Sequence, residues 1–128
     1  MKVVTKLSVT AALALCTGVA TAHHSFAMFD LGKDVTVDAV IKEVQFTNPH
    51  VWLQIMVKDD KGTETEWSIE SGAPGMMLRN GWKPSTLKAG DKVTLTMHPL
   101  RDGKPGGSLV KVKVPDGRTL GPGAPPPT

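Results

Sequence analysis

The four histidines are the residues of this chain whose types and positions could do metal chemistry: His23, His24, His50 and His98. The first two follow Ala20-Thr21-Ala22, a small-residue sequence of the kind that signal peptidase cleaves. Cleavage after Ala22 would make His23 the N-terminus, where its α-amine and ring nitrogen can chelate one metal ion. A terminal amine has a pKa of about 8, so a metal can displace its proton at neutral pH. One further imidazole, from His50 or His98, would complete a three-nitrogen histidine brace, which suits copper.

Each histidine also has an interpretation without a metal. A position directly after a signal cleavage site tolerates most polar residues, so His23 and His24 could be incidental. His50 follows a proline and could be a turn residue that bonds to the backbone, and His98 precedes a proline and could cap a strand end. The chain contains no Cys-x-x-Cys, no His-Glu-x-x-His and no carboxylate-rich calcium loop that would strengthen the metal hypothesis.

A second set of residues could bind a ligand without a metal: Trp52, Asn48, Arg101 and Asp102. Trp52 alternates in step with His50, so we expect it on the outer face, whereas Trp67 and Trp82 are expected to pack inside. The loop from Arg101 to Gly107 could close over an anion through its backbone amides, or be a plain solvated hairpin. The partner would then be a peptide, an envelope glycan or a periplasmic protein.

Residues for catalysis are few, and we expect that the protein is not an enzyme. Ser68 and Ser71 lie in no nucleophile elbow, and no phosphate-binding G-x-x-x-x-G-K sequence is present. Glu64, Glu66 and Glu70 share one parity and are predicted to form an ordinary solvent-facing polar surface. An oxidative copper enzyme would need the same histidine brace with an open position for oxygen.

Residues 1–22 have the positive start, apolar middle and A-x-A end of a cleavable signal peptide. The predicted location is therefore the bacterial periplasm or the extracellular space, with no membrane span after cleavage. The single cysteine, Cys16, lies in this leader, so the mature chain would carry no thiol or disulfide. Cys16 could instead be a lipid-modified cysteine, although Leu15 is bulky for such a site.

The charge of the mature chain argues against nucleic acid as a partner. The 15 lysines and arginines include Lys2 and Lys6 of the leader, so its removal leaves 13 against 12 Asp and Glu. The basic residues are scattered and form no stripe along the sequence, which is the usual footprint of a nucleic-acid-binding surface. The expected partner is a metal ion or a small ligand.

Alternation of apolar and polar residues predicts five strands. The first begins at Val35 and changes parity at Lys42-Glu43, which predicts a bulge. The core positions of the later strands are predicted to be Val51, Leu53, Ile55 and Val57; Trp67 and Ile69; Val93, Leu95 and Met97; and Val110, Val112 and Val114. Pro74 and Gly81 favour a short helix over 74–80, and glycine and proline predict irregular structure over 99–107.

Five strands with a helix between the third and fourth is the element order of the OB-fold, a small Greek-key barrel. We therefore predict an all-β fold with a small α contribution: a single domain over 23–120 and a disordered Gly- and Pro-rich tail over 121–128. A plain β-sandwich is the alternative.

Five segments of the mature chain also carry a resemblance: AHHSFAMFD, FTNPHVWLQ, EWSIESGAPGMMLRNGW, LKAGDKVTLTMHPLRDGKPGGSL and VPDGRTL. Together they resemble domain of unknown function 6152, a family of small secreted bacterial proteins, up to about Leu120. The resemblance implies a periplasmic single domain and places these residues in family motifs: His23, His24, Asn48, Pro49, His50, Trp67, His98, Pro99, Arg101, Asp102 and Gly103. It implies no activity, so no catalytic residue can be transferred.

Overall fold

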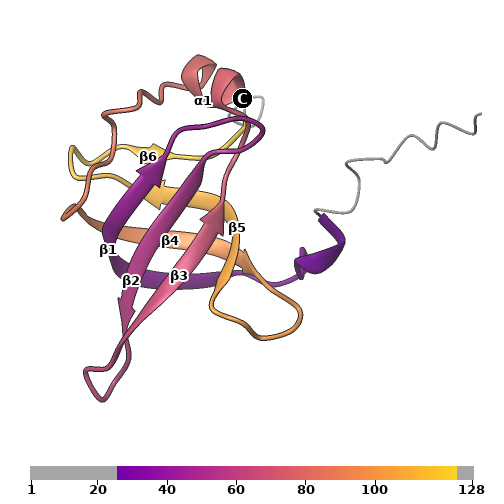
Figure 1. Cartoon of the computed structure of the whole chain (residues 1–128), viewed down its shortest axis with the longest axis vertical. Helices are drawn as coiled ribbons and strands as arrows, with labels where there is room; N and C mark the ends of the chain where they lie inside the picture. The colour runs from indigo at the N-terminus through magenta and orange to yellow at the C-terminus, as the bar shows by residue number, and fades with distance from the viewer. Residues whose placement is uncertain (1–25, 124–128) are drawn as a thin grey trace, which may run out of the picture.

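One curled sheet forms the body of the protein in the computed structural model, which describes residues 26–123 (Figure 1). β1 (Val35–Gln45) pairs antiparallel with β2 (Trp52–Lys58) and with β4 (Lys92–Pro99). β2 pairs antiparallel with β3 (Glu64–Glu70), and β4 pairs antiparallel with β5 (Gly106–Lys113). A parallel pairing of β5 with β3 closes the barrel. This is the OB-fold topology, so the predicted five-stranded barrel is confirmed. A short sixth strand, β6 (Thr119–Leu120), pairs antiparallel with β5.

The long first strand takes part in both halves of the barrel. Its first half, from Val35 to Val40, pairs with β4, and its second half, from Ala39 to Gln45, pairs with β2. The register with β2 shifts between Ile41 and Glu43, which confirms the predicted bulge. The extra residue bends the strand, as a strand shared by two halves of a barrel requires.

The barrel interior is filled by the apolar residues that alternate along the strands. The prediction is confirmed for seven of them, each no more than 5% exposed: Val51, Leu53, Ile55, Ile69, Val93, Leu95 and Met97. Burial of a side chain of this size stabilises the fold by about 1.5–3 kcal/mol relative to exposure. The predicted inward residues Val57 and Trp67 are only partly buried and pack against the edge of this cluster.

One core prediction in β5 is wrong. Thr96 pairs with Lys111 and Met97 pairs with Leu109, so Val110 is the extra residue of a bulge. Because the bulge changes the parity, Leu109 takes the core position at 3% exposure and Val110 is only half-buried. Val112 and Val114 are buried as predicted.

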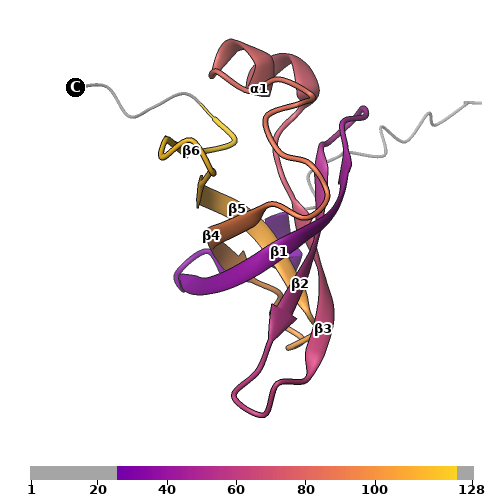
Figure 2. The ribbon, with the colours of Figure 1, turned by 90° about the vertical axis from the view of Figure 1, so that its left-hand side faces the viewer.

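A short helix closes one end of the barrel (Figure 2). Helix α1 spans Pro74–Arg79, one residue shorter than predicted, and Gly81 follows it with φ of 90°. Met77 of this helix is fully buried, and Trp82 packs beside it at 2% exposure. The indole Nε1 of Trp82 donates to the carbonyl of Gly121 at 3.0 Å, which ties the end of the described chain to the barrel.

Two glycines predicted to lie in a loop belong to β5 instead. A Cβ on Gly107 would lie 2.4 Å from the carbonyl oxygen of His98, and one on Gly106 would lie 2.6 Å from that of Ser68. Glycine therefore lets β5 approach β4 and β3 closely where the barrel closes. The prediction of irregular structure over 99–107 is wrong at both ends, because Pro99 ends β4 and Gly106 begins β5.

Candidate functional site

A row of side chains crosses the outer face of four strands at one level of the barrel. Trp52 of β2 pairs with Glu70 of β3, Glu70 pairs with Ser108 of β5, and Ser108 pairs with His98 of β4. Residues that are paired directly across neighbouring strands project to the same side of a sheet, and adjacent strands lie about 4.8 Å apart. We call Trp52, Glu70, Ser108 and His98 the outer row. His50 lies just before β2, two residues before Trp52 in the sequence.

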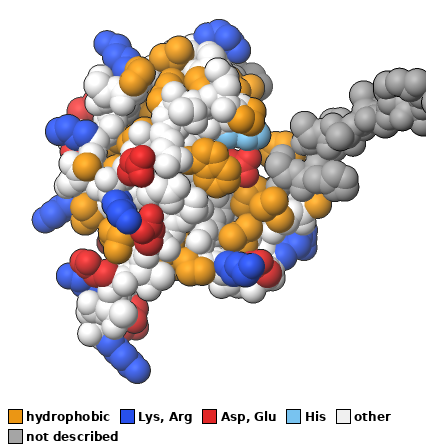
Figure 3. Space-filling model, in the orientation of Figure 1, with side chains coloured by type: hydrophobic (Ala, Val, Ile, Leu, Met, Phe, Trp, Pro, Cys, Tyr) orange, Lys and Arg blue, Asp and Glu red, His pale blue; other side chains and the backbone are white. Residues whose placement is uncertain are grey.

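His50 forms an ion pair with Glu70 of this row. Its Nδ1 lies 3.0 Å from Glu70 Oε1, and Glu70 is only 8% exposed. A carboxylate only accepts hydrogen bonds, so a hydrogen bond across this contact requires the proton on Nδ1, and a neutral ring then presents Nε2 to another partner. On the face shown in Figure 3, histidine atoms lie beside an acidic side chain.

The prediction that Glu70 faces solvent is therefore wrong. Its parity is the outward one, but Trp52 and Ser108 flank it across the sheet and His50 lies against its carboxylate. Glu64 and Glu66 are exposed as predicted and form ion pairs with Lys58 and Lys42. Thr96, another outward position by parity, is also buried, at 6% exposure.

His98 is oriented by the segment that precedes β1. Its Nδ1 lies 3.0 Å from the carbonyl oxygen of Lys33 and 3.1 Å from Asp34 Oδ1. Both partners are acceptors, so Nδ1 is again the protonated nitrogen. The ring therefore joins β4 to a residue more than sixty positions away, instead of capping the end of its own strand.

The same N-terminal segment is anchored to the loop between β4 and β5. Phe29, which is 3% exposed, forms a bridge with Leu100. Arg101 donates from its backbone N–H to the carbonyl of Met28 at 2.9 Å and from Nε to that of Ala27 at 3.2 Å. Arg101, a predicted ligand-binding residue, thus contacts the chain just after the predicted cleavage site.

The remaining predicted site residues lie apart from these contacts. Trp52 is half-buried in the outer row, and Asn48 is exposed and joined by a cis peptide bond to Pro49. Asp102 accepts a hydrogen bond at 3.0 Å from the backbone N–H of Lys104, so it stabilises a turn. His23 and His24 lie outside the described residues.

The two described histidines do not form one metal cluster. His50 is paired with Glu70 and His98 with Asp34. Within residues 26–123, no three His, Cys, Asp or Glu side chains are grouped so that they could hold a metal ion.

Glu70 is the site residue that the sequence prediction missed, although the sequence does contain a signal for it. The hairpin of β2 and β3 pairs Lys58 with Glu64 next to its turn. Counting back from that pair places Glu70 opposite Trp52, two residues from His50. Parity alone predicted exposure, because it does not register which strands close over the far end of a hairpin.

Comparison with known proteins gives a family and no function. A family model described as a family of unknown function (DUF6152) matches residues 11–110. Searches of curated proteins and of solved structures found no match. Over the described residues, no helix has the length and apolar character needed to cross a bilayer. Because the match extends over most of the sequence, the chain belongs to this family of unknown function, DUF6152.

Proposed function

We propose that this protein binds a small ligand in the bacterial periplasm, and that the ligand is copper, held by His23 and His50 once residues 1–22 have been removed. The observation that carries the proposal is the ion pair between His50 Nδ1 and the buried carboxylate of Glu70 at 3.0 Å. Histidines that bind metals in proteins almost always donate their other ring N–H to a carboxylate, a carbonyl or a water. The Nδ1 of His50 lies within reach of such a carboxylate in the protein itself.

The burial of Glu70 makes this orientation specific. Glu70 is the last residue of β3, where backbone pairing with β2 and β5 on both sides restrains it. An imidazole held in this way loses less side-chain entropy when its Nε2 binds a metal. Imidazole and amine nitrogens are donors that copper favours.

The N-terminal segment that begins at Phe26 is anchored beside the outer row. Arg101 holds the carbonyl of Ala27, and Asp30 donates its backbone N–H to Pro99 at 2.9 Å. Four residue steps separate His23 from Ala27 and can span at most roughly 14 Å, since an extended chain advances about 3.3–3.6 Å per residue. Pro99 directly follows His98 of the outer row, so the anchor lies beside that row.

His50 is favoured over His98 as the third nitrogen. The carboxylate that orients His50 is buried, whereas that of Asp34 is 61% exposed. His98 also bonds to the carbonyl of Lys33, so it already has a role in holding the N-terminal segment.

A second candidate function is binding without a metal to a peptide, an envelope glycan or a partner protein. Trp52 favours it, because this half-buried indole lies in the outer row on the β2 and β3 face. That face is the one on which other OB-folds bind oligonucleotides and oligosaccharides.

Calorimetric titration of cupric ion into protein that begins at His23 tests the proposal. We expect one copper per chain. Acetylation of the N-terminus removes the chelating amine without adding a residue, and loss of a direct ligand should weaken binding by at least about 100-fold, the upper end of what loss of an indirect partner costs. Trp52→Ala should leave copper affinity unchanged within about twofold, since this change removes no nitrogen donor.

Equal copper affinity of the native and acetylated forms would overturn the copper proposal. A protein that binds no copper but binds envelope peptidoglycan fragments, with binding lost in Trp52→Ala, would instead support the second candidate. Mass spectrometry of the secreted protein provides the control, because the proposal requires a mature chain that starts at residue 23.

A further inference from the structure

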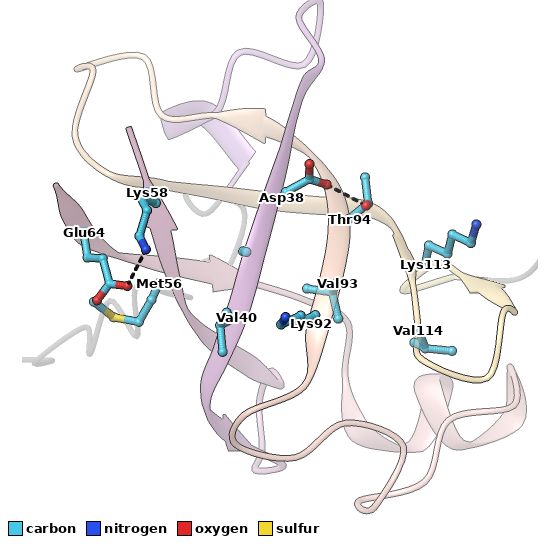
Figure 4. Close-up of a pocket in the computed structure, with 11 residues that line it drawn as sticks. Asp38, Val40, Met56, Lys58, Glu64, Lys92, Val93, Thr94, Lys113 and Val114 are labelled. Carbon is cyan, nitrogen blue, oxygen red and sulfur yellow. Dashed lines mark hydrogen bonds and ion pairs between the residues drawn. The ribbon is translucent and has the colours of Figure 1, made fainter. Parts of the chain in front are cut away.

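A cleft of about 520 Å³ lies over the outer face of β1 and shares no residue with the outer row (Figure 4). Its floor is apolar. Val40 of β1 is 37% exposed there and is paired with Met56 on one side and with Lys92 on the other. Figure 4 shows Val40 and Lys92 near the centre, between Lys58 and Glu64 on one side and Lys113 on the other.

The charges that line this cleft are unbalanced. Three lysines face two carboxylates, and both carboxylates already have partners. Glu64 Oε1 lies 3.7 Å from Lys58 Nζ, and Asp38 Oδ1 accepts a hydrogen bond from Thr94 Oγ1 at 2.7 Å. Lys92 and Lys113 form no ion pair with any residue between 26 and 123. The hydrogen bond from Thr94 leaves the charge of Asp38 in place, so these two ammonium groups exceed it by one beside an apolar floor.

We propose that this cleft binds a small organic anion with an apolar body, such as a medium-chain carboxylate. The apolar part of such a ligand would cover Val40 and Met56, and burial of their exposed surface would contribute the hydrophobic part of the affinity. Its anionic head would pair with Lys92, which lies next to Val40 across the sheet, while the charge of Lys113 adds to the attraction at the edge of the cleft. A dication or a neutral sugar would not use both features.

Titration of ¹⁵N-labelled protein with decanoate, below its micelle concentration, tests this inference by NMR. We expect saturable chemical-shift changes at Val40, Met56 and Lys92. Decanol, which has no charge, and acetate, which has no chain, should each bind more weakly than decanoate. Lys92→Ala combined with Lys113→Ala should weaken decanoate binding by about fivefold, since exposed charge contacts typically contribute a few-fold each.

Lys111→Ala is the matched control, because this lysine lies on the same strand as Lys113 but outside the cleft. It should change decanoate affinity by less than about twofold. Absence of saturable shifts, shifts centred on the outer row, or equal weakening by Lys111→Ala would each overturn the proposal. Copper binding does not enter this experiment, so its outcome is independent of the function proposed above.

Discussion

His50 and His98 make the same first contact and differ in what lies behind it. The Nδ1 of each lies close to a carboxylate oxygen, at 3.0 Å from Glu70 Oε1 and 3.1 Å from Asp34 Oδ1. Glu70 is 8% exposed at the end of an interior strand, whereas the Asp34 side chain is 61% exposed before β1. An ion pair with a buried partner in a sheet holds its imidazole in one orientation, while an exposed pair exchanges readily with water. The comparison separates a histidine held by a buried acid from one that fastens the N-terminal segment to the barrel.

A glycine of β5, the strand that closes the barrel between β4 and β3, gives the largest expected effect on stability. Gly107→Ala places a Cβ at 2.4 Å from the carbonyl oxygen of His98, so β5 must move away from β4. We expect a loss of about 3 kcal/mol in the free energy of unfolding, the upper range for overpacking. Urea denaturation measures it.

Gly75→Ala is the control for this change. In helix α1 the new Cβ would meet only Arg79 Nη1, at 3.6 Å, and alanine favours helix over glycine. This variant should gain about 0.5 kcal/mol or more. Unchanged stability of Gly107→Ala would show that barrel closure does not depend on the close approach of β5.

The two carboxylates should differ in their contribution to stability. Glu70→Ala leaves the Nδ1–H of a part-buried His50 without its partner, which should cost about 1–3 kcal/mol. Asp34→Ala removes an exposed pair and should cost less than about 0.5 kcal/mol. Denaturant unfolding at pH 7 measures both. Equal losses would remove the distinction between the two histidines.

The same carboxylates should differ in their effect on copper. Glu70→Gln keeps the shape of the side chain but changes the partner that orients His50, so copper affinity should fall about 10–100-fold. Asp34→Asn should change it by less than about threefold, because an exposed pair contributes little. Competition with a chelator of known affinity measures both. A larger loss in Asp34→Asn would assign the metal to His98.

The carboxylate of Asp91, at the turn before β4, gives the smallest expected effect on stability. Hydrogen bonds from Nζ and from the backbone N–H of Lys88, each 2.9 Å long, hold the pKa of Asp91 below its ordinary value of 3.8. Because the folded-state pKa is the lower one, the stabilisation is complete above pH 3.8 and is lost as the pH falls through the folded-state pKa. The stability difference between the wild type and Asp91→Asn should therefore shrink with acidification, as urea unfolding at several pH values would show.

Alternation in the sequence predicted the barrel well, because one buried face per strand leaves a direct trace in residue order. It placed Leu53, Ile69 and Leu95 correctly in the core. It misplaced Val110 because a bulge depends on how two distant strands pair, which no local pattern records.

The candidate site could be predicted only in part. The sequence drew attention to His50 and His98 through residue type, but their carboxylates come from β3 and from the segment before β1. Which acid meets which imidazole depends on barrel closure. Arg101 likewise received its anchoring role from a contact with Ala27, 74 residues earlier in the chain.

Pulsed electron paramagnetic resonance of the cupric protein that begins at His23 tests the central claim most directly. The proposal predicts coupling from the remote nitrogens of two imidazoles, those of His23 and His50, which falls to one imidazole in His50→Ala and stays at two in His98→Ala. A spectrum that His50→Ala leaves unchanged, with one copper still bound, would contradict the assignment of His50 as the oriented ligand.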